Sequence, residues 1–357
     1  ASIVPRAHAL DDDLAALQRA QMIRQRTRMP EATYIFKHHL TQEAAYDSLL
    51  RRKQRDLHRR VAQALERLYP ERVEERLGLL AHHWEQAEER EKAVAYLRRA
   101  GEQAAARYAN AEAVAYVTRA LALTPEQDLA GRYDLLLARE AVYNVQGARE
   151  AQHRDLVALG SLAEALDDSG PRGAGRRAEV ALRLAHYALV IGDFERVAAT
   201  VQPAIRLAQA AHDLRGEALG HLTWGRSLRL DNRQYQSANA QLAQAVALAR
   251  SASLRDVEAE SLRQLGLVCH HQHDYAGAEV YFARSLHLYR ETGDRRGEGM
   301  ALNAIGFSRL SQDEYAPARD YLVRGLSLCR ETGNRLDEGW AHAHLGQVAL
   351  GQGDYAR

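Results

Sequence analysis

The feature that most constrains this chain is an internal repeat with a step of forty residues. Residues 291–302, ETGDRRGEGMAL, return as residues 331–342, ETGNRLDEGWAH. An aromatic residue keeps the same step at Tyr235, Tyr275, Tyr315 and Tyr355, and Phe194 precedes the first of these by forty-one. A fixed period of this length is typical of stacked repeats, in which each unit buries its apolar face against the next. The sequence therefore predicts a repeat array.

Within one repeat the apolar spacing predicts a helix, a turn and a second helix. Leu262, Leu265 and Cys269 fall on one helical face, and a second face follows the breaker at residues 273–274, at Ala278, Phe282, Ser285 and Tyr289. Residues 292–294, Thr-Gly-Asp, then end the unit. Gly293 suits a left-handed helix end, and Asp294 is able to cap the next helix.

Composition agrees with helix and narrows the class of protein. Only seven residues are proline, and three lysines among 48 basic residues leave 45 arginines. The net charge is +1 because 47 acidic residues are interleaved with them, whereas nucleic-acid binders concentrate excess positive charge. We interpret the arginines mainly as helix-forming surface residues.

Cysteine usage and hydropathy indicate a compartment. The two cysteines, Cys269 and Cys329, cannot form a disulfide framework, which is expected of a reducing cytoplasm. No apolar run approaches the roughly 20 residues that span a bilayer. We expect a soluble, cytoplasmic protein.

Small residues recur where the paired helices should cross. Gly225, Gly266, Gly306 and Gly346 lie mid-way along successive first helices, where a side chain would hold the partner helix away. In an earlier unit Gly101 is followed by Ala113, Ala120 and Pro125, at twelve, nineteen and twenty-four residues. This spacing resembles the tetratricopeptide repeat (TPR). The resemblance implies an all-α fold, a right-handed superhelix of helical hairpins. We expect these at residues 93–123, 129–167, 176–211, 215–251, 255–291 and 295–331, then a first helix at 335–350, with a flexible loop at 168–175.

The first ninety residues differ from the array. We expect a helix at 14–29, a strand at 34–37 and a helix capped by Thr41. Residues 34–50 and 57–66 resemble the winged-helix-like segment that follows the nucleotide-binding module of STAND-type bacterial ATPases and leads into a repeat arm. The predicted organisation is a winged-helix-like segment at 1–70, first helical repeats at 71–167 and a TPR-like array at 176–357 that stops within its last repeat.

No motif for nucleotide chemistry is present. The chain has no Gly-x-x-x-x-Gly-Lys-Ser/Thr loop, so we expect it neither to bind nor to hydrolyse ATP. Output modules such as a nucleotide cyclase or a LuxR-type DNA-binding domain are also absent from the sequence. We expect a non-enzymatic fragment of a larger protein, without a cofactor.

Three clusters of residues are of types that bind metal ions or act in catalysis. Residues 269–274, Cys-His-His-Gln-His-Asp, hold the densest set of metal-ligand types, but two further ligands would have to come from elsewhere, so ordinary repeat positions are favoured. His38–His39 and His82–His83 are adjacent pairs, which point about 100° apart on a helix and do not chelate easily. No catalytic triad is separable from this background.

The strongest basic run is at residues 51–60, RRKQRDLHRR. It permits contact with nucleic acid or with an acidic face of a neighbouring ATPase domain. Long arginine stems also commonly cover a helix while their charges stay solvated. We favour the domain contact or the solvated face over nucleic acid.

The TPR resemblance implies a ligand groove lined by the first helices. Carried onto this sequence, its candidate residues are Arg226, Arg229, Arg263, His270, Asn303, Phe307, Trp340 and Gln347. The mixture of aromatic, amide and cationic groups favours a protein or peptide ligand over a phosphate track. The Lys/Asn clamp for a C-terminal carboxylate is not reproduced. Phe307 and Trp340 are equally compatible with packing between neighbouring helices.

The resulting hypothesis is a non-catalytic sensor or scaffold arm of a larger bacterial signalling ATPase. Its expected partners are a protein, a peptide or a small inducer in the groove, and the ATPase domain of the parent chain. Two alternatives remain open: the regulatory portion of a nucleotide cyclase or transcriptional regulator, and a nucleic-acid-binding adaptor that uses residues 51–60.

Overall fold

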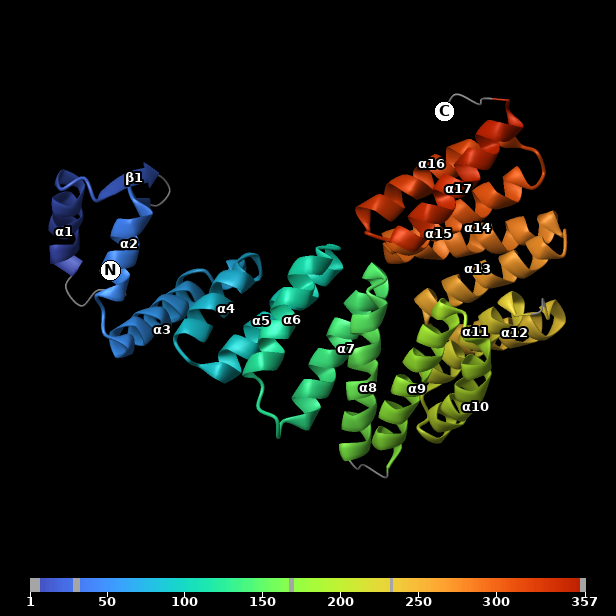
Figure 1. Cartoon of the computed structure of the whole chain (residues 1–357), viewed down its shortest axis with the longest axis horizontal. Helices are drawn as coiled ribbons and strands as arrows, with labels where there is room; N and C mark the ends of the chain where they lie inside the picture. The colour runs from blue at the N-terminus through green and yellow to red at the C-terminus, as the bar shows by residue number, and fades with distance from the viewer. Residues whose placement is uncertain (1–6, 28–32, 167–169, 232–233, 354–357) are drawn as a thin grey trace. The chain divides into compact units, whose positions relative to one another are not determined.

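The computed structural model describes residues 7–27, 33–166, 170–231 and 234–353, which form helices with one small sheet (Figure 1). The chain divides into two compact units, and each is described separately. The first holds residues 1–103 and 115–125, and the second holds residues 104–114 and 126–357.

The elements that begin the chain are mainly short. They are α1 (Ala7–Arg19), β1 (Ile23–Thr27), β2 (Thr33–Phe36), α2 (His39–Asp47), α3 (Arg51–Leu68), the 3₁₀ turns η1 (Pro70–Arg72) and η2 (Glu74–Arg76), α4 (Leu77–Gln86), α5 (Arg90–Ala106) and α6 (Asn110–Leu123). The core of the first unit gathers around Trp84 of α4, which packs with Ala62, Leu80, Ala87 and Ala93.

The helix expected at 14–29 is wrong in its second half. Helix α1 ends at Arg19, Gln21 has a left-handed φ of 55°, and Ile23–Thr27 pairs antiparallel with β2. The reason is an alternation that the helical interpretation overlooked, since Ile23 is buried while Arg24 and Arg26 are exposed. The strand expected at 34–37 is present as β2.

Helix α2 also begins earlier than expected. Its first residue is His39, and the residue before it, His38, caps it without a side-chain hydrogen bond. Thr41 therefore lies inside the first turn and is not the cap. The winged-helix-like character of residues 1–70 stays a prediction, although the two-stranded sheet and the helices beside it are observed.

The second unit consists of successive helical pairs. Its helices are α7 (Leu129–Gln146), α8 (Arg149–Ala165), α9 (Pro171–Ile191), α10 (Phe194–Ala210), α11 (Leu214–Leu230), α12 (Tyr235–Ser251), α13 (Arg255–His271), α14 (Tyr275–Thr292), α15 (Arg295–Leu310), α16 (Tyr315–Glu331) and α17 (Arg335–Gly351). Each odd-numbered helix from α7 to α15 packs against the helix that follows it. The all-α repeat fold is thereby confirmed, and the hairpins expected at 129–167, 215–251, 255–291 and 295–331 correspond to successive helix pairs.

The aromatic anchors of the repeat have a common position. Phe194, Tyr235, Tyr275 and Tyr315 are each the first residue of a second helix, α10, α12, α14 and α16. Tyr355 lies outside the described residues. The turns are also as expected, because Gly293 has φ 70° and the side chain of Asp294 accepts a hydrogen bond from the Gly297 amide at 2.8 Å.

The loop expected at 168–175 is shorter than the sequence indicated. Helix α9 already begins at Pro171 and includes Gly173 and Gly175, both taken for loop residues. Proline is well suited to the first turn of a helix, where its missing N–H has no partner to lose. The array therefore resumes at residue 171 and not at 176, while residues 167–169 lie outside the described chain.

The paired helices approach closely at glycine. A Cβ atom added to Gly266 would lie 2.5 Å from Cε1 of Phe282, and one added to Gly225 would lie 2.6 Å from Cγ of Leu242. Both distances are shorter than real Cβ atoms show, so these positions accept only glycine at this separation. A continuous core runs along α11–α15, with Leu242, Leu262 and Phe282 at its centre.

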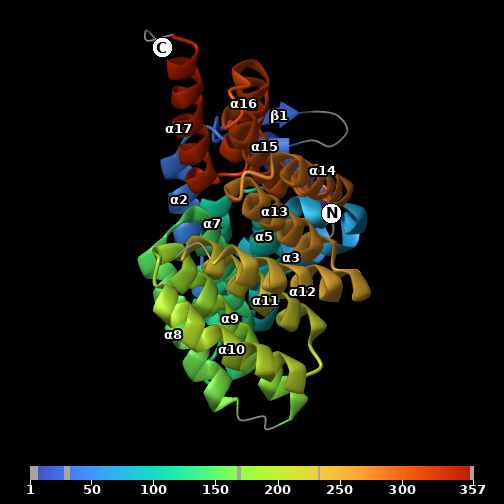
Figure 2. The ribbon, with the colours of Figure 1, turned by 90° about the vertical axis from the view of Figure 1, so that its right-hand side faces the viewer.

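The first helices form one layer of the array. Helices α9, α11, α13, α15 and α17 each contact the next, while within the described residues the second helices make no comparable contact with one another. Figures 1 and 2 show these pairs stacked in chain order from α9 to α17. Closer spacing of the first helices places them on the inner side of the curve. This is the layer that carries the predicted groove residues.

Candidate ligand-binding surface

The predicted groove residues lie on four successive first helices. Arg226 and Arg229 come from α11, Arg263 and His270 from α13, Asn303 and Phe307 from α15, and Trp340 and Gln347 from α17. Their exposure differs widely: His270 is 5% and Asn303 6% exposed, whereas Trp340 is 56% exposed. Their environments therefore have to be taken one by one.

Arg263 is held in a nearly buried ion pair. Its guanidinium donates two hydrogen bonds to the carboxylate of Glu260, both of 2.8 Å, and the two side chains are 11% and 17% exposed. Gln264 and the hydroxyl of Tyr289 donate two more, at 2.8 and 2.9 Å. Burial alone would raise the pKa of Glu260, but Arg263 and Arg226 outweigh it and hold that pKa far below its ordinary value. The charge of Arg263 is thus neutralised inside the protein.

Arg226 and Arg229 have no such partner. Within the described chain neither forms an ion pair, and Nε of Arg226 is buried without a hydrogen-bond partner. Arg229 donates to the amide of Gln264 at 3.2 Å and lies 3.3 Å from Nε2 of His271, and neither group is a carboxylate. Burial, then the charges of Arg226 and Arg263, lower the pKa of Arg229 to about 10. Both side chains therefore carry uncompensated charge.

Two further arginines, Arg149 and Arg296, and one histidine, His186, belong to the same region, and the repeat pattern did not indicate them. Arg149 donates to the neutral amides of Asn144 and Gln152, and Nε of Arg296 is buried without a partner in the described structure. Burial and the charges of Arg226, Arg149 and Arg296 lower the pKa of His186 to about 3. We call Arg149, Arg226, Arg229, Arg263 and Arg296 the arginine cluster.

Next to the arginine cluster lies a group of stacked rings. The ring of Phe307 is 4.3 Å from that of His270 and 4.6 Å from that of His344, the latter nearly parallel at 14°. Trp340 follows at 5.9 Å from His344. We call these four residues the ring cluster. Burial and the neighbouring histidines lower the pKa of His270 to about 4, so its imidazole is neutral near pH 7.

A pocket of about 320 Å³ lies where the two clusters meet. Its lining residues are Arg229, Leu230, Tyr235, His270, His271, His273, Tyr275 and Ser311. The ring of His271 stacks on Tyr235 at 5.9 Å, and its Nε2 also lies 3.3 Å from the guanidinium of Arg229. The pocket thus offers one uncompensated cation and several imidazole and phenol groups.

Asn303 is engaged in the packing of its own repeat. Its amide nitrogen donates to the backbone oxygen of Asp337 at 3.2 Å and toward Sγ of Cys329 at 3.5 Å. The added Cβ of Gly325 would meet its Oδ1 at 2.1 Å, so the side chain lies in the crossing between α15 and α16. Asn303 joins helices, and only its carbonyl oxygen has no partner among the described residues.

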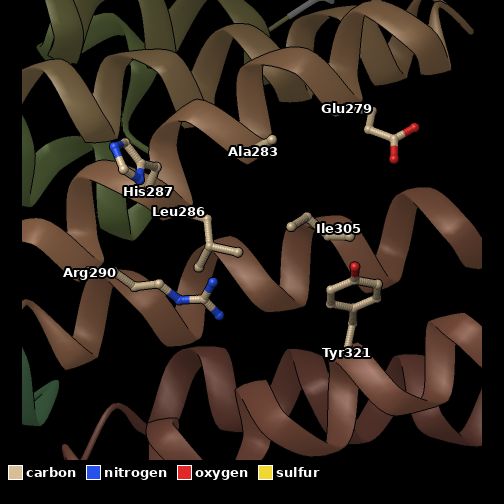
Figure 3. A pocket seen from close by; sticks show the side chains of 7 residues that line it. All are labelled: Glu279, Ala283, Leu286, His287, Arg290, Ile305 and Tyr321. Atoms are coloured by element: carbon tan, nitrogen blue, oxygen red, sulfur yellow. The ribbon is translucent and has the colours of Figure 1, made fainter.

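A second pocket, of about 260 Å³, involves the outer helices α14 and α16 (Figure 3). Its charged side chains are all paired: Arg290 with Glu298 at 2.8 Å, His287 with Glu291 at 3.1 Å, and Glu279 with Arg309. Figure 3 shows Arg290 and Glu279 at separate ends of the pocket, with Leu286 and Ile305 between them. No charge is left over there for a ligand.

The other clusters weighed from the sequence are dispersed or paired. Within the described residues no group of three or more His, Cys, Asp or Glu side chains is arranged to hold a metal ion, and Cys269 is a free thiol. In the basic run of α3, Arg55 pairs with Glu88 at 2.5 Å and Arg59 with Glu89 at 2.7 Å. Part of the positive charge of that run is therefore neutralised by the acidic residues just before α5.

The first unit contains a histidine cluster that sequence reasoning missed. Nδ1 of His58 lies 2.9 Å from Nδ1 of His83, and the ring of His82 lies 5.7 Å from that of His58. Burial and the two neighbouring histidines lower the pKa of His83 to about 4. His58 lies on α3, whereas His82 and His83 lie on α4. Their contact therefore depends on how the two helices pack, which no spacing within one helix indicates.

Comparison with known proteins identifies the type of repeat. Residues 257–331 match the sequence profile of the tetratricopeptide repeat. The fold is a tetratricopeptide-repeat solenoid. No curated protein sequence matches this solenoid.

Several solved structures share the solenoid at low sequence identity. A Rap protein complexed with competence and sporulation factor has a TM-score of 0.53 and 14% identity, over 87% of this chain and 91% of that one. A signal transduction ATPase with numerous domains (STAND) and a TPR sensor, from Pyrococcus horikoshii, has a TM-score of 0.53 and 12% identity, over 94% of this chain and 48% of that one. Aspartyl phosphate phosphatase F from Bacillus subtilis has a TM-score of 0.51 and 12% identity, over 98% and 85%. No helix of the described residues is long and apolar enough to cross a membrane.

Proposed function

We propose that this solenoid is a non-catalytic sensor or scaffold arm that binds a protein or peptide on the layer of its first helices. The observation that carries the proposal is the juxtaposition of the arginine cluster and the ring cluster, whose residues lie on the first helices α11, α13, α15 and α17 except for Arg149 on α8. Repeat solenoids bind through such extended inner surfaces because consecutive units present equivalent positions in a row. The Rap protein among the similar folds is complexed with competence and sporulation factor, which supports ligand binding by a solenoid of this kind.

The ring cluster is the expected anchor for an apolar side chain of the partner. Interfaces concentrate their binding energy in aromatic and arginine residues, and Trp340 is 56% exposed beside the partly buried Phe307. Phe307 also packs between His270 and His344, so its two roles have to be separated by experiment.

The test is a capture experiment with matched variants. We expect Trp340→Ala to weaken partner binding at least tenfold, as is usual for a central aromatic anchor, with an unchanged helical circular dichroism spectrum. Leu336→Ala is the control, because Leu336 is 60% exposed on the same helix and lies outside both clusters. Normal binding by Trp340→Ala and Phe307→Ala, together with loss of binding on substitution of outer-helix residues, would sink the proposal.

We further propose that the arm belongs to a larger signalling ATPase of the STAND type. The resemblance of residues 34–66 to the segment between ATPase and repeats supports this, as does the similar fold of a STAND protein with a TPR sensor. The coding sequence around this segment provides the test. A phosphate-binding loop in the same reading frame is expected, and a cyclase domain without such a loop would favour the alternative parent.

A further inference from the structure

The charge balance inside the inner layer is the starting point. The arginine cluster holds five guanidinium groups, and the carboxylates that act on them most directly are Glu260 and Asp337. Glu260 is fully engaged by Arg263, Gln264 and Tyr289. Glu140 and Glu179 both pair with Arg183, and the charge of Glu140 also acts on Arg149. Positive charge therefore remains in excess where the side chains are partly or largely buried.

Buried like charges of this kind need a partner. A histidine in such a place loses its proton, as His186 does, because burial and three arginines lower its pKa to about 3. A guanidinium has no such escape, because it stays protonated at any pH at which the protein is folded. An exposed arginine is neutralised by water and salt, but Nε of Arg226 and of Arg296 is buried and without a partner in the described chain. An anion bound at these side chains would neutralise them.

We propose that the arginine cluster is an oxyanion site, which takes from the ligand of the arm a phosphate group or a set of neighbouring carboxylates, with at least two negative charges in total. The planar guanidinium fork matches two oxygens of either group. Arg226, Arg229 and Arg296, contributed by α11 and α15, are its principal donors, and Arg149 adds charge from α8. The inference rests on the proposed function, since it names the chemistry of the ligand for the same inner layer.

The position of the site also constrains the rest of the ligand. Arg229 belongs both to the arginine cluster and to the 320 Å³ pocket that His270, His271 and Tyr275 line. A ligand bound by its oxyanion to Arg226 and Arg229 thus has an imidazole and phenol surface next to it, and the ring cluster beyond. We expect the anionic group to be attached to an apolar or planar part.

The experiment uses inorganic pyrophosphate and citrate as probes with the full chain. Calorimetry at low salt is expected to show binding of at least one of them, with an affinity that falls as salt rises. The tighter probe distinguishes a phosphate from a carboxylate source. Arg226→Gln and Arg296→Gln should each weaken binding about tenfold or more, because each removes a charge-assisted bidentate contact. Arg284→Gln, with the same charge change on the exposed face of α14, should leave it unchanged.

The melting temperature without any anion provides a second readout. Removal of an uncompensated charge relieves repulsion, so Arg226→Gln should melt at the same temperature as the parent protein or above it. A merely structural arginine would lower it. No binding of either probe at millimolar concentration, or equal losses in Arg226→Gln and Arg284→Gln, would overturn the oxyanion site.

The two proposals fail in different ways. If neither probe binds but Trp340→Ala still abolishes partner capture, the oxyanion site alone is wrong. If Arg226→Gln no longer binds pyrophosphate or citrate, while Arg226→Gln and Trp340→Ala both capture the partner normally, the inner layer binds an anion but is not the partner surface.

Discussion

At the scale of single residues, the difference between Arg263 and Arg226 decides what the inner layer is able to do. The repeat pattern placed both on the inner face of a first helix, yet Arg263 is held in an ion pair with Glu260 while Arg226 has a buried Nε without a partner among the described residues. Removal of one partner from a buried ion pair leaves the other charge buried and unpaired, which destabilises the folded state. Glu260 is therefore expected to be important for the stability of this repeat.

We expect Glu260→Gln to destabilise the protein strongly. The substitution leaves the nearly buried charge of Arg263 without its ion-pair partner, and one-sided removal of a buried pair typically costs about 3–5 kcal/mol. Chemical denaturation followed by circular dichroism measures the change. Glu279→Gln is the control, because its carboxylate is 58% exposed and such surface pairs contribute only about 0–1 kcal/mol. Equal stability of the two variants would show that Glu260 does not hold the cluster.

At the scale of helices, the chain offers matched glycines at the same repeat position. A Cβ on Gly266 of α13 would clash with Phe282, whereas within the described chain one on Gly346 of α17 would meet nothing within 4 Å. We expect Gly266→Ala to lower the stability by about 1–3 kcal/mol, as overpacking does. Gly346→Ala should be neutral or stabilising by up to about 1 kcal/mol, because alanine favours helix. The measurement is a denaturation curve for each, and a neutral Gly266→Ala would place that residue away from a helix crossing.

The contact between α3 and α4 should depend on pH through its histidine cluster. Burial lowers the pKa of His58 and, to about 4, that of His83. As the pH falls below about 6.5, the ordinary pKa of histidine, these side chains take up protons in the unfolded chain but not in the folded one. This contribution to stability is fully present above pH 6.5 and falls as the pH decreases toward 4.

The measurement is the free energy of unfolding of the first unit against pH, by urea denaturation. His83→Gln keeps a hydrogen-bonding side chain without the titration, so the curve of this variant should be flatter between those pH values. Identical slopes would mean that the cluster does not control the contact.

At the scale of the whole molecule, stability should be distributed along the repeats. Each unit of a solenoid contacts mainly its neighbours, so a local defect spreads only one repeat away. We expect Tyr275→Ala to speed amide hydrogen exchange in α13, α14 and α15 and to leave α9 and α10 protected. Its cost should stay below the roughly 3–5 kcal/mol of a fully emptied aromatic site, because Tyr275 is only partly buried. A uniform loss of protection would indicate one cooperative core instead.

The sequence by itself determined the repeat, because periodic burial leaves a periodic pattern. The forty-residue step fixed which residues pair as helical hairpins, Tyr275 and its equivalents marked where second helices begin, and Gly266 marked a crossing. It also selected first-helix residues such as Arg226 and Phe307 as a shared surface. It was less successful at residues 23–27 and 171–175, where a short strand and a proline-initiated helix depend on a partner strand and on the context of the array.

Only the tertiary structure decided which polar groups neutralise one another. Ion pairing depends on contacts between helices that are far apart in the sequence and follows no period. The same long-range packing brings the charges of Arg296 and Arg226 near His186, and it brings His58 of α3 to His83 of α4. Asn303 illustrates the same limit, since its repeat position indicated the groove but its amide is used against Asp337 and Cys329. The position of a residue in the repeat determines which face of the helix it occupies. Whether its polar group stays available for a ligand depends on the neighbours that the tertiary structure brings to it.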